Sequence, residues 1–421
     1  MYEPTRKYIE EHLNDDINRL ALSKFPENVD KQFVIRQIQA RQLLSKKLPS
    51  WAENDELVFP KKLSLEQCSS EFTARYKASL IKGKTLIDMT GGMGVDTVFL
   101  SDSFEKTFYV EMQDELCEIA KNNFKVLNKN IAVVNDNAEH FLTICDEVDC
   151  IYLDPARRDE YGRKMVSLHD CSPDVVEIRE LLWKKAKTIM IKVSPMLDIE
   201  MVRKELEDIS EIHVVAVKNE CKEILICQRS TDNGQQSSVK TSEASTRLIA
   251  TDLRENWNFT FTDDEESDAQ WTLADSIGKY LYEPGVACMK AGCFKLLSQR
   301  YGLDKLHRNS HLYTSDKLAS DFPGRIFEVL NVVPFDKKTK KEIFSKCQTI
   351  DNNQQTKNQN PCVPQHSKTL SKIKASVATR NFPLPAEELK KNLGLHDGND
   401  FYIFGTTMKG EKKVVILTKK N

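Results

Sequence analysis

A glycine-rich turn within residues 85–96 constrains this chain more than any other stretch. A short apolar run ends there on Asp88, and three glycines follow within four positions. Glycines permit positive φ and close approach of the backbone to a ligand, and a helix predicted from Val95 would offer free N–H groups at its start. The pattern predicts a ligand-binding turn between the first strand and first helix of an α/β sheet. Thr97 stands where the dinucleotide fingerprint has its third glycine, which disfavours a nicotinamide or flavin cofactor.

The order strand, turn, helix repeats after this turn. Apolar and β-branched runs alternate with segments of helical periodicity, and the predicted strands are 86–87, 107–110, 131–134, 150–153 and 188–193. Such alternation predicts a parallel sheet with helices on both faces. Ligands of these sheets bind outside the carboxyl ends of the strands.

Acidic residues stand at four of those strand ends, namely Asp88, Glu111, Asp136 and Asp154. One such residue alone is usually a turn former or a cap. Four in succession, with a glycine turn after the first, indicate a ligand site. Glu111 follows Asp88 by 23 residues, which is about the spacing of a carboxylate that accepts hydrogen bonds from two ribose hydroxyls. The pattern therefore predicts a nucleoside-containing ligand.

Length and composition narrow the class of protein. A chain of 421 residues exceeds one ordinary core, so two or three domains are expected. No apolar run approaches a membrane span, and the acidic, amphipathic N-terminal segment is unlike a signal peptide, which predicts a cytoplasmic protein. Eleven scattered cysteines without a Cys-x-x-Cys pair predict reduced thiols, with neither a disulfide framework nor a metal site. No heptad pattern stands out, so no oligomeric state is predicted.

Charge is distributed unevenly along the chain. Residues 335–421 hold 17 Lys and Arg against 8 Asp and Glu, whereas the remainder holds 44 against 55. A basic terminal module suggests attraction to a polyanion such as RNA. A lysine-rich solubilising surface explains the charge equally well.

Several motifs carry a resemblance to known proteins. Residues 88–94, Glu111, Asp136 and residues 154–157 resemble the four cofactor motifs of class I S-adenosylmethionine-dependent methyltransferases. More narrowly, the chain is similar to a bacterial family that joins this domain to a small ferredoxin-like domain and a C-terminal THUMP-like domain. The stretches that match this family are 66–70, 192–198, 219–223 and 379–383. From the residues alone, helix capping and packing would explain 66–70 as well as ligand contact does.

The resemblance implies a fold and a domain order. The fold is α/β, with a Rossmann-like, seven-stranded class I methyltransferase sheet closed by a hairpin of strands 212–217 and 223–227. The implied domains are an N-terminal helical region at 1–80, an S-adenosylmethionine-binding domain at 81–230, a linker with a ferredoxin-like domain at 231–335, and a basic THUMP-like domain at 336–421. Residues 347–368 are rich in Asn, Gln and Lys and predict a flexible connection.

The resemblance also assigns roles in binding S-adenosylmethionine. It implies that Glu111 holds the ribose, that Asp136 meets the adenine amino group, and that Asp154 closes the site near the sulfonium as the catalytic residue. The remaining cofactor-binding residues that it implies are Asp88, Thr90, Gly91, Gly92, Gly94, Met112 and Asn137.

The acceptor is less defined. Enzymes that methylate exocyclic amines tend to carry an aromatic residue where this chain has Arg157, which disfavours such a product. RNA uracil C5 enzymes, which the Asp-Pro-x-Arg pattern also resembles, use a cysteine soon after the fifth strand, where this chain has Ser194. Cys171 is an alternative nucleophile, although a buried structural thiol is the simpler interpretation. Arg157 and Arg158 could clamp a phosphate or stack on a base, or pair with neighbouring acidic residues.

These observations predict a methyltransferase that acts on a tRNA or rRNA base. Arg157, Arg158, Ser194 and Arg380 are the predicted substrate-binding residues, and Arg380 could equally belong to a structural turn. Two alternatives remain open from the sequence. One is a methyltransferase on a protein or small molecule, and the other is a non-catalytic protein that binds S-adenosylmethionine or RNA.

Overall fold

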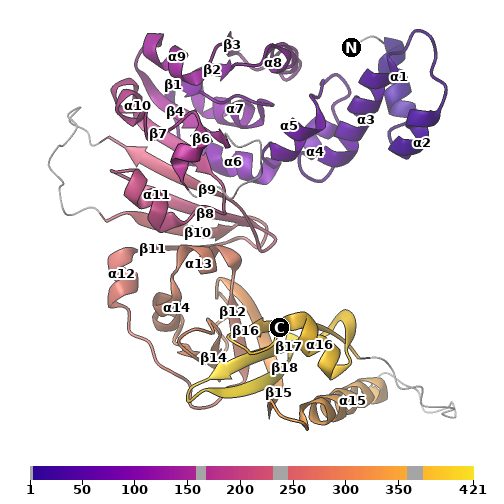
Figure 1. Cartoon of the computed structure of the whole chain (residues 1–421), viewed down its shortest axis with the longest axis vertical. Coiled ribbons are helices and arrows are strands. Elements are labelled where there is room, and N and C mark those ends of the chain that lie inside the picture. Colours follow the sequence, from indigo (N-terminus) through magenta and orange to yellow (C-terminus); the bar gives the residue numbers. More distant parts are fainter. Residues whose placement is uncertain (1–2, 158–166, 231–244, 358–372) are drawn as a thin grey trace. The chain divides into compact units, whose positions relative to one another are not determined.

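The protein forms two compact units. The computed structural model describes residues 3–157, 167–230, 245–357 and 373–421, and the units are Met1–Trp257 and Asn258–Asn421 (Figure 1). Among the described residues, none of the helices combines the length and the apolar character needed to cross a membrane. Each unit is built around its own sheet.

The first unit begins with helices, as predicted. Asp16 and Asp30 accept backbone N–H groups at the starts of the second and third helices, which explains where these helices begin. Further along, Trp51 and Phe59 are buried in one hydrophobic core with Tyr109 of the sheet. The helical region is therefore packed on the sheet through apolar side chains. Its helices are α1 (Glu3–Glu11), α2 (Ile17–Leu22), α3 (Lys31–Leu44), α4 (Pro49–Ala52), α5 (Lys62–Gln67) and α6 (Glu71–Leu80).

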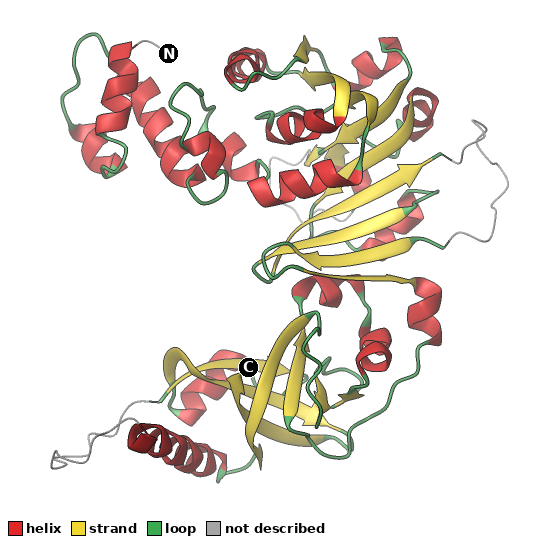
Figure 2. Ribbon diagram, turned by 180° about the vertical axis from the view of Figure 1, so that it is seen from behind, coloured by secondary structure: helices red, strands yellow, loops and turns green. Residues whose placement is uncertain are grey.

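The main sheet of the first unit follows the predicted alternation. Its strands are β1 (Gly83–Asp88), β2 (Phe104–Glu111), β3 (Ile131–Asn135), β4 (Val148–Leu153), β7 (Ala186–Val193), β8 (Glu211–Val217), β9 (Glu220–Arg229) and β10 (Arg247–Asp252). Helices lie on both sides of this sheet (Figure 2). They are α7 (Val95–Leu100), α8 (Asp114–Val126), α9 (Ala138–Ile144), α10 (Arg179–Lys185) and α11 (Ile199–Glu205). The short strands β5 (Ala156–Arg157) and β6 (Cys171–Ser172) form a separate antiparallel pair.

The order of strands is β10-β8-β9-β7-β4-β1-β2-β3. Neighbours from β7 to β3 are parallel, and β9 runs antiparallel to both β7 and β8, which is the predicted closing hairpin. The sheet has nine strands where seven were predicted. The ninth, β11 (Trp257–Thr262), begins at the last residue of this unit.

The strand count differs because the chain returns to the sheet after residue 230. Strand β10 pairs in parallel with β8 along its full length, from Arg247 beside Glu211 to Asp252 beside Ala216. The first compact unit consequently extends to Trp257 and does not end near residue 230.

In the second unit, one seven-stranded sheet joins the two predicted α+β regions. Its order is β13-β14-β12-β15-β18-β17-β16, and the long strand β15 pairs with β12 on one edge and with β18 on the other. The elements are α12 (Asp263–Asp268), β12 (Tyr280–Pro284), α13 (Val286–Ala291), α14 (Phe294–Tyr301), β13 (Asp304–Lys305), β14 (Tyr313–Ser315), β15 (Gly324–Pro334), α15 (Thr339–Lys357), β16 (Lys374–Arg380), α16 (Ala386–Leu393), β17 (His396–Met408) and β18 (Lys412–Lys420).

Helix α15 corrects the prediction of a flexible connection at residues 347–368. Its 19 residues continue through Lys357, although the segment from 347 has few apolar side chains. Ile343 and Cys347 are fully buried in the core of the second unit. This apolar contact anchors the helix, and helix formation then continues through residues whose composition alone indicated a loop. Residues 358–368 lie outside the described part of the chain.

Arg380, a predicted substrate-binding residue, is engaged in an ion pair within the second unit. Its guanidinium donates to Glu283 Oε1 at 2.7 Å, and Arg325 donates to the other oxygen of the same carboxylate. Glu283 is only 3% exposed, so these two guanidiniums compensate its buried charge. The pairs connect β16, β12 and β15, which gives Arg380 a structural role in this unit.

We expect Arg380→Met to lower the free energy of unfolding by about 1–3 kcal/mol, because Glu283 loses one of its two charged partners. Lys409→Met is the matched control, since Lys409 pairs with Asp275 at 2.6 Å on the surface, where 87% of the Asp275 side chain is exposed. Chemical denaturation of the full chain measures both. Equal effects of the two substitutions would contradict the structural role.

Candidate functional site

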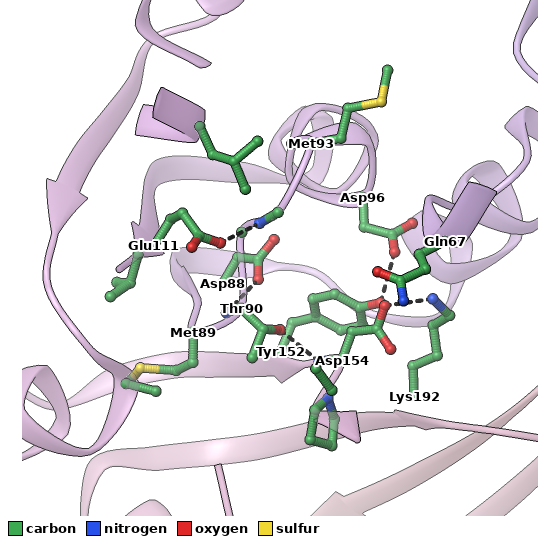
Figure 3. A pocket seen from close by; sticks show the side chains of 18 of the residues that line it. Gln67, Asp88, Met89, Thr90, Met93, Asp96, Glu111, Tyr152, Asp154 and Lys192 are labelled. Atoms are coloured by element: carbon green, nitrogen blue, oxygen red, sulfur yellow. Dashed lines mark hydrogen bonds and ion pairs between the residues drawn. The ribbon is translucent and has the colours of Figure 1, made fainter. Parts of the chain in front are cut away.

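The carboxyl ends of the parallel strands enclose a cavity of about 790 Å³. A close view shows how side chains from several strand ends face it (Figure 3). The structure brings together every predicted cofactor-binding residue and one of the predicted substrate-binding residues in its lining. They are Asp88, Thr90, Gly91, Gly92, Gly94, Glu111, Met112, Asp136, Asn137, Asp154 and Ser194.

The glycine turn after β1 is packed tightly onto the sheet. A Cβ atom at Gly91 would lie 2.2 Å from the ring of Tyr109, so no larger residue fits there. Gly92 and Gly94 have φ of +53° and +82°, which glycine adopts at low cost. The Tyr109 hydroxyl donates to the Gly92 carbonyl at 2.6 Å. These contacts hold the turn at the cavity wall.

Two backbone groups orient the carboxylate of Glu111 at the end of β2. The Gly92 N–H donates to Oε2 and the Gln113 N–H donates to Oε1, each at 2.9 Å. Each carboxylate oxygen can accept a further hydrogen bond. Glu111 is thus fixed in place with acceptor capacity left for two hydroxyl groups of a ligand.

Asp88 is buried at the end of β1, with 1% of its surface exposed. Thr97 Oγ1 donates to Oδ2 at 2.5 Å and the Thr90 N–H donates to Oδ1 at 3.0 Å. Burial nevertheless raises the pKa of Asp88 to about 7, against the effect of these hydrogen bonds. The hydrogen bond from Thr97 also gives this residue a role. Thr97 stands where a dinucleotide fingerprint has its third glycine, and here it holds the Asp88 carboxylate in place.

Asp136 and Asn137 lie together where β3 leads into α9. Asn137 Oδ1 accepts the His140 N–H at 2.7 Å and caps the helix. His140 Nδ1 lies 2.6 Å from Asp136 Oδ2. His140 is a neighbour of the site that the sequence did not predict. It lies in the first turn of α9, and Asp136 directly precedes the capping residue Asn137.

Asp154 meets a lysine from the neighbouring strand. Its backbone N–H donates to Thr90 Oγ1 at 2.6 Å, and Lys192 Nζ lies 2.5 Å from Asp154 Oδ2. Lys192 belongs to β7 and Asp154 follows β4, so the pair forms across adjacent strands. Lys192 belongs to the stretch 192–198 that matches the family, but no role was predicted for its side chain.

A group of buried polar residues behind this pair was not predicted. Lys77 is fully buried, and its Nζ lies 2.8 and 2.9 Å from the two oxygens of Glu223, 3.0 Å from Ser69 Oγ and 3.2 Å from Asp96 Oδ1. Tyr152 donates its hydroxyl to Asp96 Oδ2 at 2.7 Å. Lys77 and Glu223 are 146 positions apart, so spacing could not have connected them.

The stretch 66–70 also lies at the cavity. Helix α5 ends at Gln67 and α6 begins at Glu71, so this stretch forms the junction between two helices. Gln67, Cys68 and Ser69 line the cavity at this junction. From the residues alone, ligand contact and helix capping explained this stretch equally well. The structure exposes the side chains of Gln67, Cys68 and Ser69 to the cavity, where they can contact a ligand.

Other predicted residues lie elsewhere. The backbone of Arg157 pairs with Cys171 in the β5–β6 pair, whereas Arg158 lies outside the described residues. Cys171 is 2% exposed and is not part of the cavity lining, so the structure favours the structural interpretation of this thiol.

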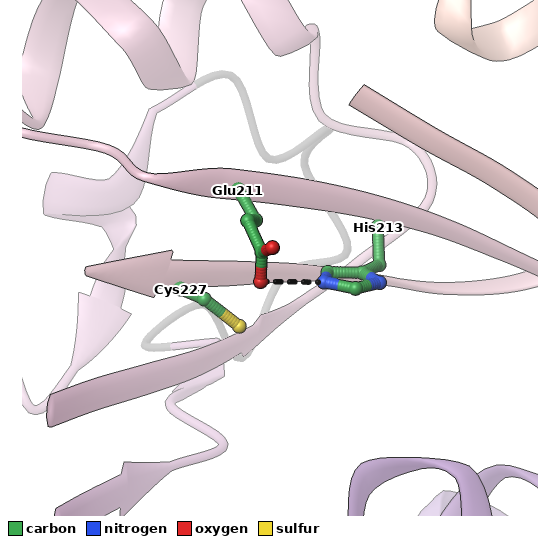
Figure 4. Close-up of side chains that lie close together, drawn as sticks. All are labelled: Glu211, His213 and Cys227. Carbon is green, nitrogen blue, oxygen red and sulfur yellow. Dashed lines mark hydrogen bonds and ion pairs between the residues drawn. The ribbon is translucent and has the colours of Figure 1, made fainter. Parts of the chain in front are cut away.

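A second cluster of potential ligand atoms lies on β8 and β9. Glu211, His213 and Cys227 have side-chain atoms within 4.8 Å of one another (Figure 4). Glu211 is already paired with Arg229, at 2.5 Å, and with Arg247. The hydrogen bond from His213 and these arginines hold the pKa of Glu211 well below its usual range, while burial raises the pKa of the Cys227 thiol to about 12. Two cations at the carboxylate and a protonated thiol favour an ion-pair cluster over a metal site.

Comparison with known proteins agrees with this architecture. A ferredoxin-like domain model matches residues 280–323, and a THUMP domain-like model matches residues 362–420. A crystal structure described as a candidate methyltransferase from Porphyromonas gingivalis W83 is 32% identical in sequence. The match between the two covers 99% of this chain and 97% of the Porphyromonas chain, with a TM-score of 0.80. The fold and the cavity thus define an α/β protein of the class I methyltransferase type. The chain belongs to the family of that Porphyromonas protein, which confirms the predicted resemblance.

Other solved structures resemble only part of the chain. An rRNA methylase from Streptococcus thermophilus is 13% identical and covers 38% of this chain and 96% of that chain, with a TM-score of 0.29. A methyltransferase candidate from Streptococcus mutans in complex with S-adenosylhomocysteine is 15% identical and covers 37% of this chain and 94% of that chain, with a TM-score of 0.28. No curated protein matches this sequence.

Asp88 should make stability depend on pH. Its pKa rises from 3.8 to about 7 on folding, so the folded protein keeps a proton that the unfolded chain releases. The linked stabilisation is complete below about pH 4, falls as the pH rises, and is lost above about pH 7. Asparagine carries no titratable proton, so Asp88→Asn does not lose this stabilisation. We therefore expect the free energy of unfolding of Asp88→Asn, relative to that of the wild type, to increase as the pH rises from 5 to 8. Denaturant titrations of both proteins at these two pH values measure the difference, and an unchanged difference would contradict the assignment.

Proposed function

We propose that the protein is an S-adenosylmethionine-dependent methyltransferase that acts on RNA. The observation that carries the proposal is the oriented carboxylate of Glu111, which shares one cavity with the glycine turn and with the Asp154–Lys192 pair.

Ten cysteines without a disulfide among the described residues fit a reducing compartment, so we place this activity in the cytoplasm.

The cavity residues fit S-adenosylmethionine. Glu111 has acceptor capacity for both ribose hydroxyls, and Asp136 and Met112 border the part of the cavity where an adenine would lie. The glycine turn and Asp88 would hold the methionine portion. The turn suits this role because Gly92 has no side chain on its open side, where an added Cβ would meet only the Thr90 carbonyl oxygen, at 3.7 Å, so a ligand can approach the backbone closely.

When bound, the sulfonium of S-adenosylmethionine supplies an activated methyl group. The protein then has to align an acceptor with that methyl group and exclude water. Asp154 lies beside Lys192 and away from Glu111 in the cavity lining (Figure 3), and about one-third of its side chain is exposed, so it can contact an acceptor that enters the cavity.

RNA as the substrate is supported by the second unit. The THUMP domain-like match at residues 362–420 falls within the basic stretch 335–421, which carries nine more Lys and Arg than Asp and Glu. A surplus of this kind favours binding to the phosphate backbone of RNA. Four residues were predicted to contact this substrate, and that role stays a prediction for each: Arg157, Arg158, Ser194 and Arg380.

We expect Glu111→Gln to weaken S-adenosylmethionine binding about tenfold or more. The amide nitrogen of the glutamine would face the N–H group of Gly92 or Gln113, which it cannot accept a hydrogen bond from. It would also remove one of the two oxygens that accept hydrogen bonds from the ribose hydroxyls. Glu118→Gln is the matched control, because Glu118 is 72% exposed on α8 and pairs only with Lys121 in the described contacts. Calorimetric titration of the full chain measures both affinities. Equal affinities in the two variants would contradict the assigned ribose site.

Nucleoside analysis of RNA by mass spectrometry tests the proposed function. We expect one methylated nucleoside to disappear from small or ribosomal RNA in cells that lack the gene, and Asp154→Ala to reproduce the loss. An unchanged nucleoside profile would contradict an RNA substrate. Binding of S-adenosylmethionine to the purified protein would then separate a methyltransferase of proteins or small molecules from a protein without turnover.

A further inference from the structure

The Asp154–Lys192 pair indicates what kind of atom accepts the methyl group. Figure 3 shows Lys192, Asp154 and Asp96 gathered together, apart from Glu111. All three line the cavity, and Lys192 is the more buried partner of the pair, with 13% of its side chain exposed against 36% for Asp154. An ammonium group and a partly free carboxylate are therefore both presented to an acceptor.

Lys192 is held as a cation. Burial works against its charge, but the carboxylates of Asp154, Asp96 and Glu223 outweigh this effect and keep the pKa of the lysine above its ordinary value. A lysine in this state does not act as a base at neutral pH. It can stabilise negative charge that develops on a neighbouring atom.

The other carboxylate at this wall is already engaged. Asp96 Oδ2 accepts from Ser69 Oγ at 2.8 Å and from the Tyr152 hydroxyl at 2.7 Å, and its Oδ1 faces Lys77 at 3.2 Å. Asp154 has Lys192 on one oxygen, and its side chain is the more exposed of the two. Asp154 is consequently the carboxylate that can receive a proton from an acceptor.

An ammonium at the acceptor side discriminates among acceptor atoms. A nitrogen that takes a methyl group from a sulfonium develops positive charge, which the nearby Lys192 opposes. A hydroxyl oxygen loses its proton and develops negative charge, which Lys192 favours. The electrostatics of this wall thus suit an alcohol better than an amine.

Attack by the C5 carbon of a uracil ring would need a cysteine thiolate. Among the described residues that line the cavity, Cys68 is the one thiol. Burial raises the pKa of Cys68, and its Sγ donates to the Leu65 carbonyl at 3.2 Å. A protonated thiol that is bound to its own helix is a poor nucleophile.

We infer that Lys192 and Asp154 bind and activate a hydroxyl group, and that the methyl acceptor is the ribose 2′-hydroxyl of RNA. This inference rests on the proposed function, and it replaces the base acceptor expected from the sequence. The 2′-hydroxyl is the alcohol that every nucleotide within an RNA strand carries. The acceptor oxygen forms a bond to the methyl carbon while the bond from that carbon to sulfur breaks. The hydroxyl proton passes to Asp154 and then to water, and the electron pair of the broken bond stays on sulfur, which leaves as the neutral thioether.

Lys77 and Glu223 are positioning residues in this scheme. Neither residue lines the cavity, but Lys77, which is paired with Glu223, contacts Ser69 and Asp96 and fixes their side chains. The Asp96 carboxylate in turn helps to keep Lys192 positively charged. Removal of one partner would leave a buried charge uncompensated.

The experiment uses the full-length protein, S-adenosylmethionine labelled on its methyl group, and total RNA from cells that lack the gene. The labelled RNA is hydrolysed in alkali, which cleaves beside a free 2′-hydroxyl but leaves a dinucleotide where that hydroxyl is methylated. Label in alkali-stable dinucleotides is the expected result. Label in mononucleotides would show base methylation and would overturn the inference while leaving the proposed function intact. Absence of label from RNA, with S-adenosylmethionine still bound, would overturn both.

Lys192→Met tests the role of the ammonium. We expect methyl transfer to fall by on the order of 10²–10³-fold while the affinity for S-adenosylmethionine changes little. Lys192→Arg keeps the charge and should restore part of the activity. Lys187→Met is the matched control, since Lys187 lies on the same strand and pairs with Asp149 at 3.1 Å, but 75% of its side chain is exposed. Full activity of Lys192→Met would overturn the assignment, and circular dichroism separates loss of activity from loss of folding.

Discussion

The close packing of the glycine turn on Tyr109 is the constraint on which the site depends. Gly91 has no room for a side chain above the ring, and the Tyr109 hydroxyl binds the carbonyl of the next residue. The turn therefore lies low on the sheet and leaves the space above the strand ends open. Glu111 is fixed by the same turn, through the Gly92 N–H. One local packing contact thus sets both the shape of the cavity and the orientation of Glu111, the carboxylate that we propose binds the ribose.

Buried charge organises the opposite wall. Lys77 is stable in the interior because Glu223 and Asp96 surround it, and the same carboxylates help to keep Lys192 charged. Such a network is costly when incomplete and rigid when satisfied. The wall that we propose faces the acceptor is therefore preorganised before any substrate binds. Preorganised charge of this kind is an effective means of stabilising a transition state.

Much of the cofactor side could be predicted from the sequence because its signals are local. Asp88 and Glu111 each end an apolar run, and parallel strands bring such ends to one edge of a sheet. Charged pairs between residues far apart in the sequence could not be predicted in this way. Lys77 meets Glu223 across 146 positions near the cavity, and Arg380 meets Glu283 across 97 in the second unit, so only the folded topology reveals these pairs. Strand β10 and helix α15 were missed for a related reason, since tertiary contacts override what the local composition favours.

A crystal structure of the full-length protein with S-adenosylhomocysteine would show where the cofactor lies in the cavity. We predict that both ribose hydroxyls lie within hydrogen-bond distance of the Glu111 carboxylate, and that the sulfur points toward Asp154 and Lys192. A ligand bound elsewhere, or one whose sulfur points away from this pair, would contradict the assignment of the two walls of the cavity.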